Sequence, residues 1–137
     1  MKLDTQQRQI LEALGDQLIP IDATRMSASQ AEISTWSDAV LEARPDLVSP
    51  LLALLESARS ENPRDFVDQL RRDEVASFDV LSEVVCGAYF MNPLVQKAIG
   101  YNGQGPREID PRVDYLEDGL LESVIKRGPI YRPTPAQ

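Results

Sequence analysis

Four acidic side chains in the last third of the chain have the chemistry to bind a cation. They are Asp110, Asp114, Glu117 and Asp118. A calcium loop needs oxygen ligands at its first, third and fifth positions. Asp114 and Asp118 would take the first and fifth positions, but the third falls on Leu116, which offers no ligand. Because acids also favour the positive end of a helix, we interpret the cluster as a helix start and expect no metal site.

The side chains that most often perform catalysis are scarce. The chain has no histidine, the commonest general base and metal ligand. Its one cysteine, Cys86, has no basic neighbour that would lower its thiol pKa, so we expect a buried or interface thiol. Glycines 100, 103 and 105 do not have the spacing of a phosphate-binding GxGxxG loop, and we expect them in turns. The sequence therefore predicts no catalytic, cofactor-binding or metal-binding residue, and no enzyme activity without a partner.

The charge balance restricts the classes of partner. The chain has 14 Lys and Arg side chains against 22 Asp and Glu, a net charge of −8 that repels nucleic acid and anionic membrane surfaces. The longest aliphatic run, residues 51–55, is too short to cross a bilayer, so we expect no direct membrane insertion. The first residues carry no export signal, which predicts a cytoplasmic location. Transport to the periplasm on a partner that carries a signal stays open.

Composition divides the chain near residue 92. Residues 1–91 carry 16 acidic and 8 basic side chains and so hold the whole net charge, whereas residues 92–137 carry six of each. Six of the ten prolines and five of the seven glycines also fall in residues 92–137. We therefore expect an acidic helical body over 1–91 and a Pro/Gly-rich arm over 92–137, with one or two helices in the arm, within a single domain.

Apolar residues at helical spacing predict an all-α fold, a small bundle of about six helices with an extended C-terminal arm. No segment alternates polar and apolar side chains as a half-buried strand would. Five helix-start signals lie in the body: Asp4 with Gln7, Ser29 with Glu32, Ser49 with Pro50, Asn62 with Pro63, and Ser77.

The arm carries two further helix signals. Asn92 and Pro93 begin a short helix that Gly100 ends. A last helix is predicted over residues 115–126, with basic side chains at its negative end and a glycine soon after it. Three prolines within residues 129–137 predict an extended tail.

The strongest candidates for function are apolar, aromatic and arginine side chains around and within the arm. Tyrosine and arginine are enriched where interfaces gain most of their binding energy, and proline lowers the entropy lost on docking. Packing of these side chains back onto their own helices is the alternative, and composition leaves both open. The candidate partner-binding residues are Tyr89, Phe90, Met91, Leu94, Tyr101, Tyr131 and Arg132.

Three segments resemble one known family, in the family's order. Residues 89–101, YFMNPLVQKAIGY, are similar to a central segment of the gluconate 2-dehydrogenase subunit 3 family. Residues 11–20, LEALGDQLIP, resemble that family's opening segment, and residues 127–133, RGPIYRP, its closing one. The match over residues 89–101 is the most specific of the three.

The resemblance implies that this chain binds a partner subunit and does not itself catalyse a reaction. Members of this family are small subunits of dehydrogenases whose large subunit, of the glucose-methanol-choline type, holds FAD and oxidises CH–OH groups of sugars and alcohols. The small subunit stabilises the large one and helps it mature, and a cytochrome subunit is a further partner that stays open. Many members carry a twin-arginine signal, which this sequence lacks. The alternative function is a stand-alone helical adaptor or chaperone-like protein without a flavoprotein partner.

Overall fold

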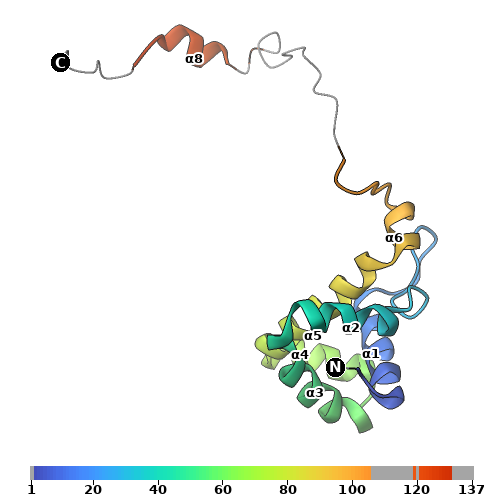
Figure 1. Cartoon of the computed structure of the whole chain (residues 1–137). Coiled ribbons are helices and arrows are strands. Elements are labelled where there is room, and N and C mark those ends of the chain that lie inside the picture. Colours follow the sequence, from blue (N-terminus) through green and yellow to red (C-terminus); the bar gives the residue numbers. More distant parts are fainter. Residues whose placement is uncertain (1, 106–118, 120, 131–137) are drawn as a thin grey trace, which may run out of the picture. The chain divides into compact units, whose positions relative to one another are not determined.

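The computed structural model describes residues 2–105, 119 and 121–130. Contacts between residues divide the chain into two compact units, Met1–Gly103 and Gln104–Gln137. Across the described residues the regular elements are all helical, which confirms the predicted all-α class (Figure 1). The α-helices are α1 (Thr5–Leu18), α2 (Ile33–Ala43), α3 (Val48–Ser57), α4 (Pro63–Asp73), α5 (Val75–Met91), α6 (Pro93–Ala98) and α8 (Glu122–Arg127).

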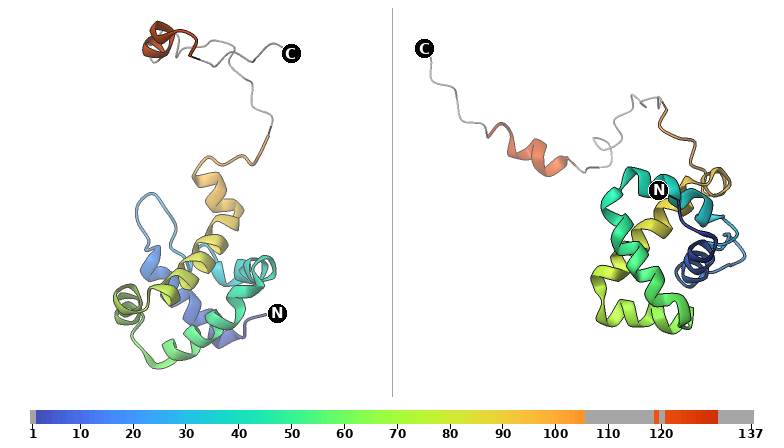
Figure 2. Two further views of the ribbon diagram at one scale, coloured as in Figure 1. Left: turned by 90° about the vertical axis from the view of Figure 1, so that its left-hand side faces the viewer. Right: turned by 60° about the horizontal axis from the view of Figure 1, so that its bottom comes forward.

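The core of the first unit forms around α5. This helix packs against α2, α3, α4 and α6, and Figure 2 shows it crossing the bundle with the other helices around it. Leu81, Val84 and Val85, on the apolar face of this helix, are fully buried. The largest fully buried apolar side chains of the unit are Leu11, Leu14, Ile33, Leu51, Leu55, Leu70, Leu81, Val84, Val85 and Val95.

Two of the predicted start signals in the body are confirmed. Asp4 accepts a hydrogen bond from the backbone N–H of Gln7, and the Gln7 side chain accepts one from the N–H of Asp4, which completes a capping box at α1. Asn62 accepts from the N–H groups of Arg64 and Asp65 at the start of α4. Both signals act within one turn of chain, so the sequence contains everything they need.

The signal at Ser29 and Glu32 is wrong as a capping box. The N–H and hydroxyl of Ser29 both donate to the carboxylate of Asp16, over 2.8 and 2.7 Å, and α2 begins later, at Ile33. Glu32 is the residue before α2, in the left-handed region with φ of 51°, and caps nothing with its side chain. The carboxylate of Asp16 on α1 thus accepts the hydrogen bond from the Ser29 N–H that the Glu32 side chain would accept in a capping box.

The predicted starts at Ser49 and Ser77 are also wrong. Helix α3 begins at Val48, directly after a 3₁₀ turn at Pro45–Leu47, so Ser49 lies inside the helix. Helix α5 begins at Val75, and the Ser77 hydroxyl donates to the Glu74 carboxylate over 3.3 Å instead of capping the backbone. In both places the helix starts closer to the preceding element than the local signal indicates.

The first unit continues past residue 91, where the composition changes. Asn92 accepts a hydrogen bond from the N–H of Leu94, as predicted, and Val95 of α6 is buried in the core. Gly100, with φ of +71°, follows α6 in a conformation that L side chains rarely adopt, which confirms it as the end of this helix.

The second unit contains α8. The helix predicted over 115–126 is confirmed only from Glu122 onward, since Gly119 has a φ of +75° and Leu121 precedes the helix. Residues 115–118 and 120 lie outside the described part of the chain, as do Pro133 and the rest of the tail after Ile130. Gly128 follows α8 directly with φ of +66°. In neither unit do the described residues form a helix with the length and hydropathy that a bilayer span requires.

Candidate functional site

Tyr89, on the last turn of α5, differs from the other candidate residues that the structure describes because it is buried, with 6% of its surface exposed. Its hydroxyl donates a hydrogen bond to the backbone carbonyl of Met26 over 2.9 Å. Its ring meets that of Phe90 edge to face, with ring centroids 5.4 Å apart. Tyr89 therefore connects the segment between α1 and α2 to α5, and its ring packs against the exposed ring of Phe90.

Asn92 makes a second connection to the same segment. Its side-chain amide donates to the carbonyl of Ala31 over 2.8 Å, while its side-chain oxygen caps α6 by accepting from Leu94. The residue is buried, and both its donor and its acceptor are used. The sequence predicts the cap at Asn92. It does not predict the bond to Ala31, because nothing in the local sequence identifies that carbonyl as the acceptor.

These connections fix the direction in which α6 leaves the body. The Gln96 side chain adds a third link by donating to the carbonyl of Phe90 over 2.8 Å. The N–H of Tyr101 then donates to the carbonyl of Gln96 over 2.8 Å and folds the chain back at the end of the helix. These hydrogen bonds hold together the end of α5, α6 and the following turn, which follow one another along the ribbon in Figure 1.

Large apolar side chains are exposed on this part of the molecule. Leu94 has 63% of its surface exposed, and Phe90 and Tyr101 have half of theirs exposed. Isolated exposed apolar residues are ordinary, whereas several within one short stretch of chain are less common. We define the α6 surface by its exposed apolar side chains: Ile21, Phe90, Met91, Leu94, Ile99 and Tyr101.

Ile21 is the member that sequence analysis missed. It is 63% exposed and lies in the loop between α1 and α2, where no periodic pattern marks it. This loop and α6 border a groove of about 450 Å³. Its lining residues are Ile21, Asp22, Ala23, Thr24, Arg25, Met26, Gln30, Leu94 and Ala98.

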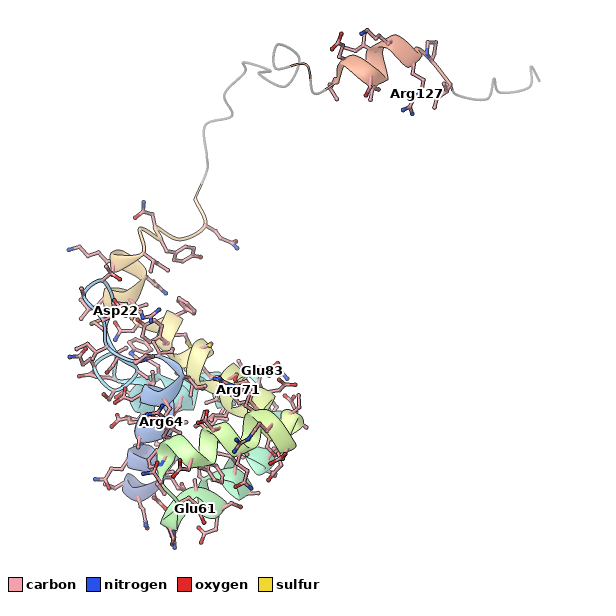
Figure 3. The ribbon with its side chains drawn as sticks, turned by 180° about the vertical axis from the view of Figure 1, so that it is seen from behind. Asp22, Glu61, Arg64, Arg71, Glu83 and Arg127 are labelled. Atoms are coloured by element: carbon pink, nitrogen blue, oxygen red, sulfur yellow. The ribbon has the colours of Figure 1, made fainter. Side chains whose placement is uncertain are left out.

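Asp22 gives the loop its shape. One of its carboxylate oxygens accepts hydrogen bonds from the N–H and hydroxyl of Thr24, both over 2.7 Å, and from the N–H of Arg25 over 3.0 Å. Its other oxygen lies 2.8 Å from the Arg25 guanidinium. The Thr24 hydroxyl, the Thr24 N–H and the Arg25 charge hold the pKa of Asp22 below its usual 3.8. Figure 3 labels Asp22 on this loop.

Other candidate residues have different surroundings. Cys86 is exposed on α5, so the prediction of a thiol buried within this chain is wrong, and a role at an interface stays a prediction. Partial desolvation by its neighbours raises the pKa of the thiol above its usual value, which lowers its reactivity at neutral pH. Glycines 100 and 103 have positive φ values, as expected for turns.

The second unit presents exposed apolar side chains of its own. Val124 and Ile125 of α8 and Ile130 are exposed, and Lys126 pairs with Glu122 over 2.6 Å. Figure 3 labels Arg127 at the end of this helix. Two of the predicted partner-binding residues, Tyr131 and Arg132, lie outside the described residues, as do the four acids at 110, 114, 117 and 118.

Across residues 2–105, 119 and 121–130, acidic and cysteine side chains do not gather in a group that could hold a metal ion. Comparison with family models, with curated proteins and with solved structures finds no match for this chain.

Proposed function

We propose that this chain is a non-catalytic small subunit that binds and stabilises a larger FAD-dependent subunit through the α6 surface. The observation that carries the proposal is the set of exposed apolar side chains around α6. Tyr89 and Asn92 hold them in a defined arrangement by hydrogen bonds to backbone carbonyls of the preceding loop. A preorganised apolar surface loses little entropy on binding, so it favours a stable complex.

The resemblance of residues 89–101 to the gluconate 2-dehydrogenase subunit 3 family supports a flavoprotein as the partner. These residues are the ones that form the end of α5, α6 and the turn after it. In the proposed complex the large subunit binds FAD and oxidises a CH–OH group of a sugar or alcohol. This chain contributes stability by mass action, because it binds only the folded form of its partner. An obligate interface of this kind buries more than about 2,000 Å².

Co-expression with a candidate FAD-dependent large subunit of the glucose-methanol-choline type from the same organism tests the proposal. We expect the two chains to elute together in size-exclusion chromatography, and the large chain to be more soluble and richer in flavin than when expressed alone. Separate elution, with a large chain that is equally soluble and flavin-loaded on its own, contradicts the proposal and favours the stand-alone adaptor. Truncation after Gly128 then asks whether Tyr131 and Arg132 contribute, because complex formation that survives unchanged removes them from the interface.

A matched pair of variants locates the interface. Leu94→Ser removes an apolar side chain that is 63% exposed on α6, and we expect it to weaken the complex at least about tenfold if Leu94 is an anchor residue. Val75→Ser changes a side chain of similar exposure, 59%, at the other end of α5, and should leave the complex intact. Equal loss in both variants would place the contact elsewhere.

A further inference from the structure

A second groove lies at the end of α5 far from the α6 surface. It has a volume of about 570 Å³ and lies between α3, α4 and the start of α5. Its floor is apolar, with Phe66 and Leu70 from α4 facing Leu54 from α3. The lining residues are Pro50, Ala53, Leu54, Ser57, Glu61, Phe66, Gln69, Leu70, Glu74, Ala76, Ser77 and Val80.

The charge of this groove is unbalanced. Its charged lining residues are Glu61 and Glu74, and no lysine or arginine lines it. Among the ion pairs of the described residues, none involves either glutamate. Figure 3 labels Glu61 near the start of α4. Two like charges beside a low-dielectric floor produce a focused negative potential, which attracts cations.

The other grooves carry charges of both signs. A groove beside α1 is lined by Arg59 together with Glu61, which also borders the groove at Glu74. The groove beside α6 contains Asp22 and Arg25, which pair with each other over 2.8 Å. A groove between α1 and α4 is lined by two acids and two bases, Asp16 and Asp68 with Arg64 and Arg71. Among these grooves, the one at Glu61 and Glu74 therefore has only acidic charged lining residues, which favours a cationic occupant.

We propose that this groove binds a polypeptide segment of a partner protein that presents an apolar side chain flanked by lysine or arginine. The apolar side chain packs over Ala53 and Val80 and the accessible edge of Phe66, and the flanking cations lie against Glu61 and Glu74. Gln69 supplies a side-chain amide for the backbone of the segment. The Ser57 and Ser77 hydroxyls, which donate to the Ala53 carbonyl and the Glu74 carboxylate, can still accept hydrogen bonds from it. The net charge of −8 over residues 1–91 attracts a cationic segment to the body as a whole.

The groove is independent of the α6 surface. Helix α5 has 17 residues, so at 1.5 Å per residue its two ends lie about 24 Å apart. Residues at its start line the groove, and residues at its end belong to the α6 surface. Both surfaces can therefore be occupied at once, and the inference stands or falls separately from the proposed function.

Fluorescence anisotropy with two labelled probe peptides tests the inference on the full chain. One probe is a short amphipathic peptide of leucine and lysine, and the other has glutamate in place of lysine. We expect the leucine–lysine peptide to bind, with an affinity that falls as salt rises, and the leucine–glutamate peptide not to bind. Equal binding of the two peptides, or binding of neither, overturns the inference.

One matched pair of double variants distinguishes peptide binding in the groove from general attraction to an acidic protein. Replacing both groove acids, in E61Q/E74Q, should weaken binding of the leucine–lysine peptide about tenfold. The control E32Q/E42Q removes the same charge from two exposed acids outside the groove that take part in none of the ion pairs of the described residues, and should have little effect. Equal weakening in both double variants means that only net charge is sensed, and overturns the inference.

The apolar floor is tested by filling it. Ala53→Phe places a ring at an exposed lining position of α3 and should abolish peptide binding. Ala43→Phe adds the same ring at an exposed position at the end of α2, outside the groove, and should not. Circular dichroism confirms that each variant keeps its helical content, and binding that persists in a folded A53F chain contradicts the proposed site.

Discussion

The hydroxyl of Tyr89 donates a hydrogen bond over 2.9 Å to the carbonyl of Met26, 63 residues earlier in the chain. This bond joins the last turn of α5 to the loop between α1 and α2, and Asn92 joins the same loop through Ala31. The exposed residues of the α6 surface therefore depend on two buried ones for their position. A residue can contribute to such a surface without touching a partner.

Tyr89→Phe removes this hydroxyl and keeps the ring. We expect the free energy of unfolding to fall by about 1 kcal/mol, because the Met26 carbonyl loses a partly buried hydrogen bond. Tyr101→Phe, at a tyrosine that is half exposed, should change it by less than about 0.5 kcal/mol. Urea denaturation followed by circular dichroism measures both, and equal stabilities of the two variants would mean that the Met26 bond contributes nothing.

Asn92→Asp separates the two functions of one side chain. Aspartate still caps α6, but it cannot donate to the Ala31 carbonyl and places a charge in a buried site. We expect a loss of about 3 kcal/mol in the free energy of unfolding at pH 7.

Asn62→Asp provides the control for that substitution. Asn62 is exposed and its side chain only accepts hydrogen bonds, from Arg64 and Asp65, so aspartate can replace it at the start of α4. Its stability should stay within about 0.5 kcal/mol of the parent protein. A similar loss in both variants would show that capping, and not the Ala31 bond, determines the effect at Asn92.

The sequence predicted the all-helical class correctly, but of its six capping signals only those at Asp4, Asn62 and Asn92 hold. Capping at Asp4, Asn62 and Asn92 was correct because the donor and acceptor lie within three residues of each other. Ser29 has an equally good local signal, but Asp16 competes for its donors once α1 packs beside it. That competition depends on tertiary structure, which a local pattern does not contain.

The same limit applies to part of the candidate surface. The sequence named Leu94 and not Val95 as a candidate, and the structure exposes Leu94 and buries Val95. A helix of six residues buries one narrow face, so adjacent apolar positions have opposite surroundings. Ile21 was missed because it lies in a loop, where apolar residues follow no period.

Gly15→Ala tests a close approach that the sequence did not predict. A Cβ atom at Gly15 would lie 2.6 Å from the Ile33 side chain and 2.9 Å from that of Ala28, so α1 and the segment before α2 would have to separate. We expect a loss of about 1–3 kcal/mol, although alanine favours the helix elsewhere. Gly105→Ala, where nothing lies within 4 Å, is the control. Thermal melts of the two variants should differ clearly, and a G15A chain as stable as its parent would show that the helices adjust without cost.

Asp22 makes the loop beside α6 sensitive to acid. Hydrogen bonds from Thr24 hold the pKa of the Asp22 carboxylate below 3.8 in the folded protein. A lowered pKa means that the loop's stabilisation is complete above pH 3.8 and disappears as the pH falls through the folded value. Carboxyl carbon shifts measured by NMR should therefore titrate with a midpoint below 3.8.

Thr24→Val removes the hydroxyl bond but keeps the backbone N–H and Arg25. We expect the Asp22 midpoint to move upward toward 3.8 without reaching it. Asp46, whose pKa Arg44 lowers through an unrelated ion pair, provides the internal reference and should not move. Because the loop lines the groove beside Leu94, amide shifts of α6 should change over the same pH range as Asp22. If the amide shifts of α6 change with the titration of Asp46 instead of Asp22, the conformation of α6 does not depend on the Asp22 turn.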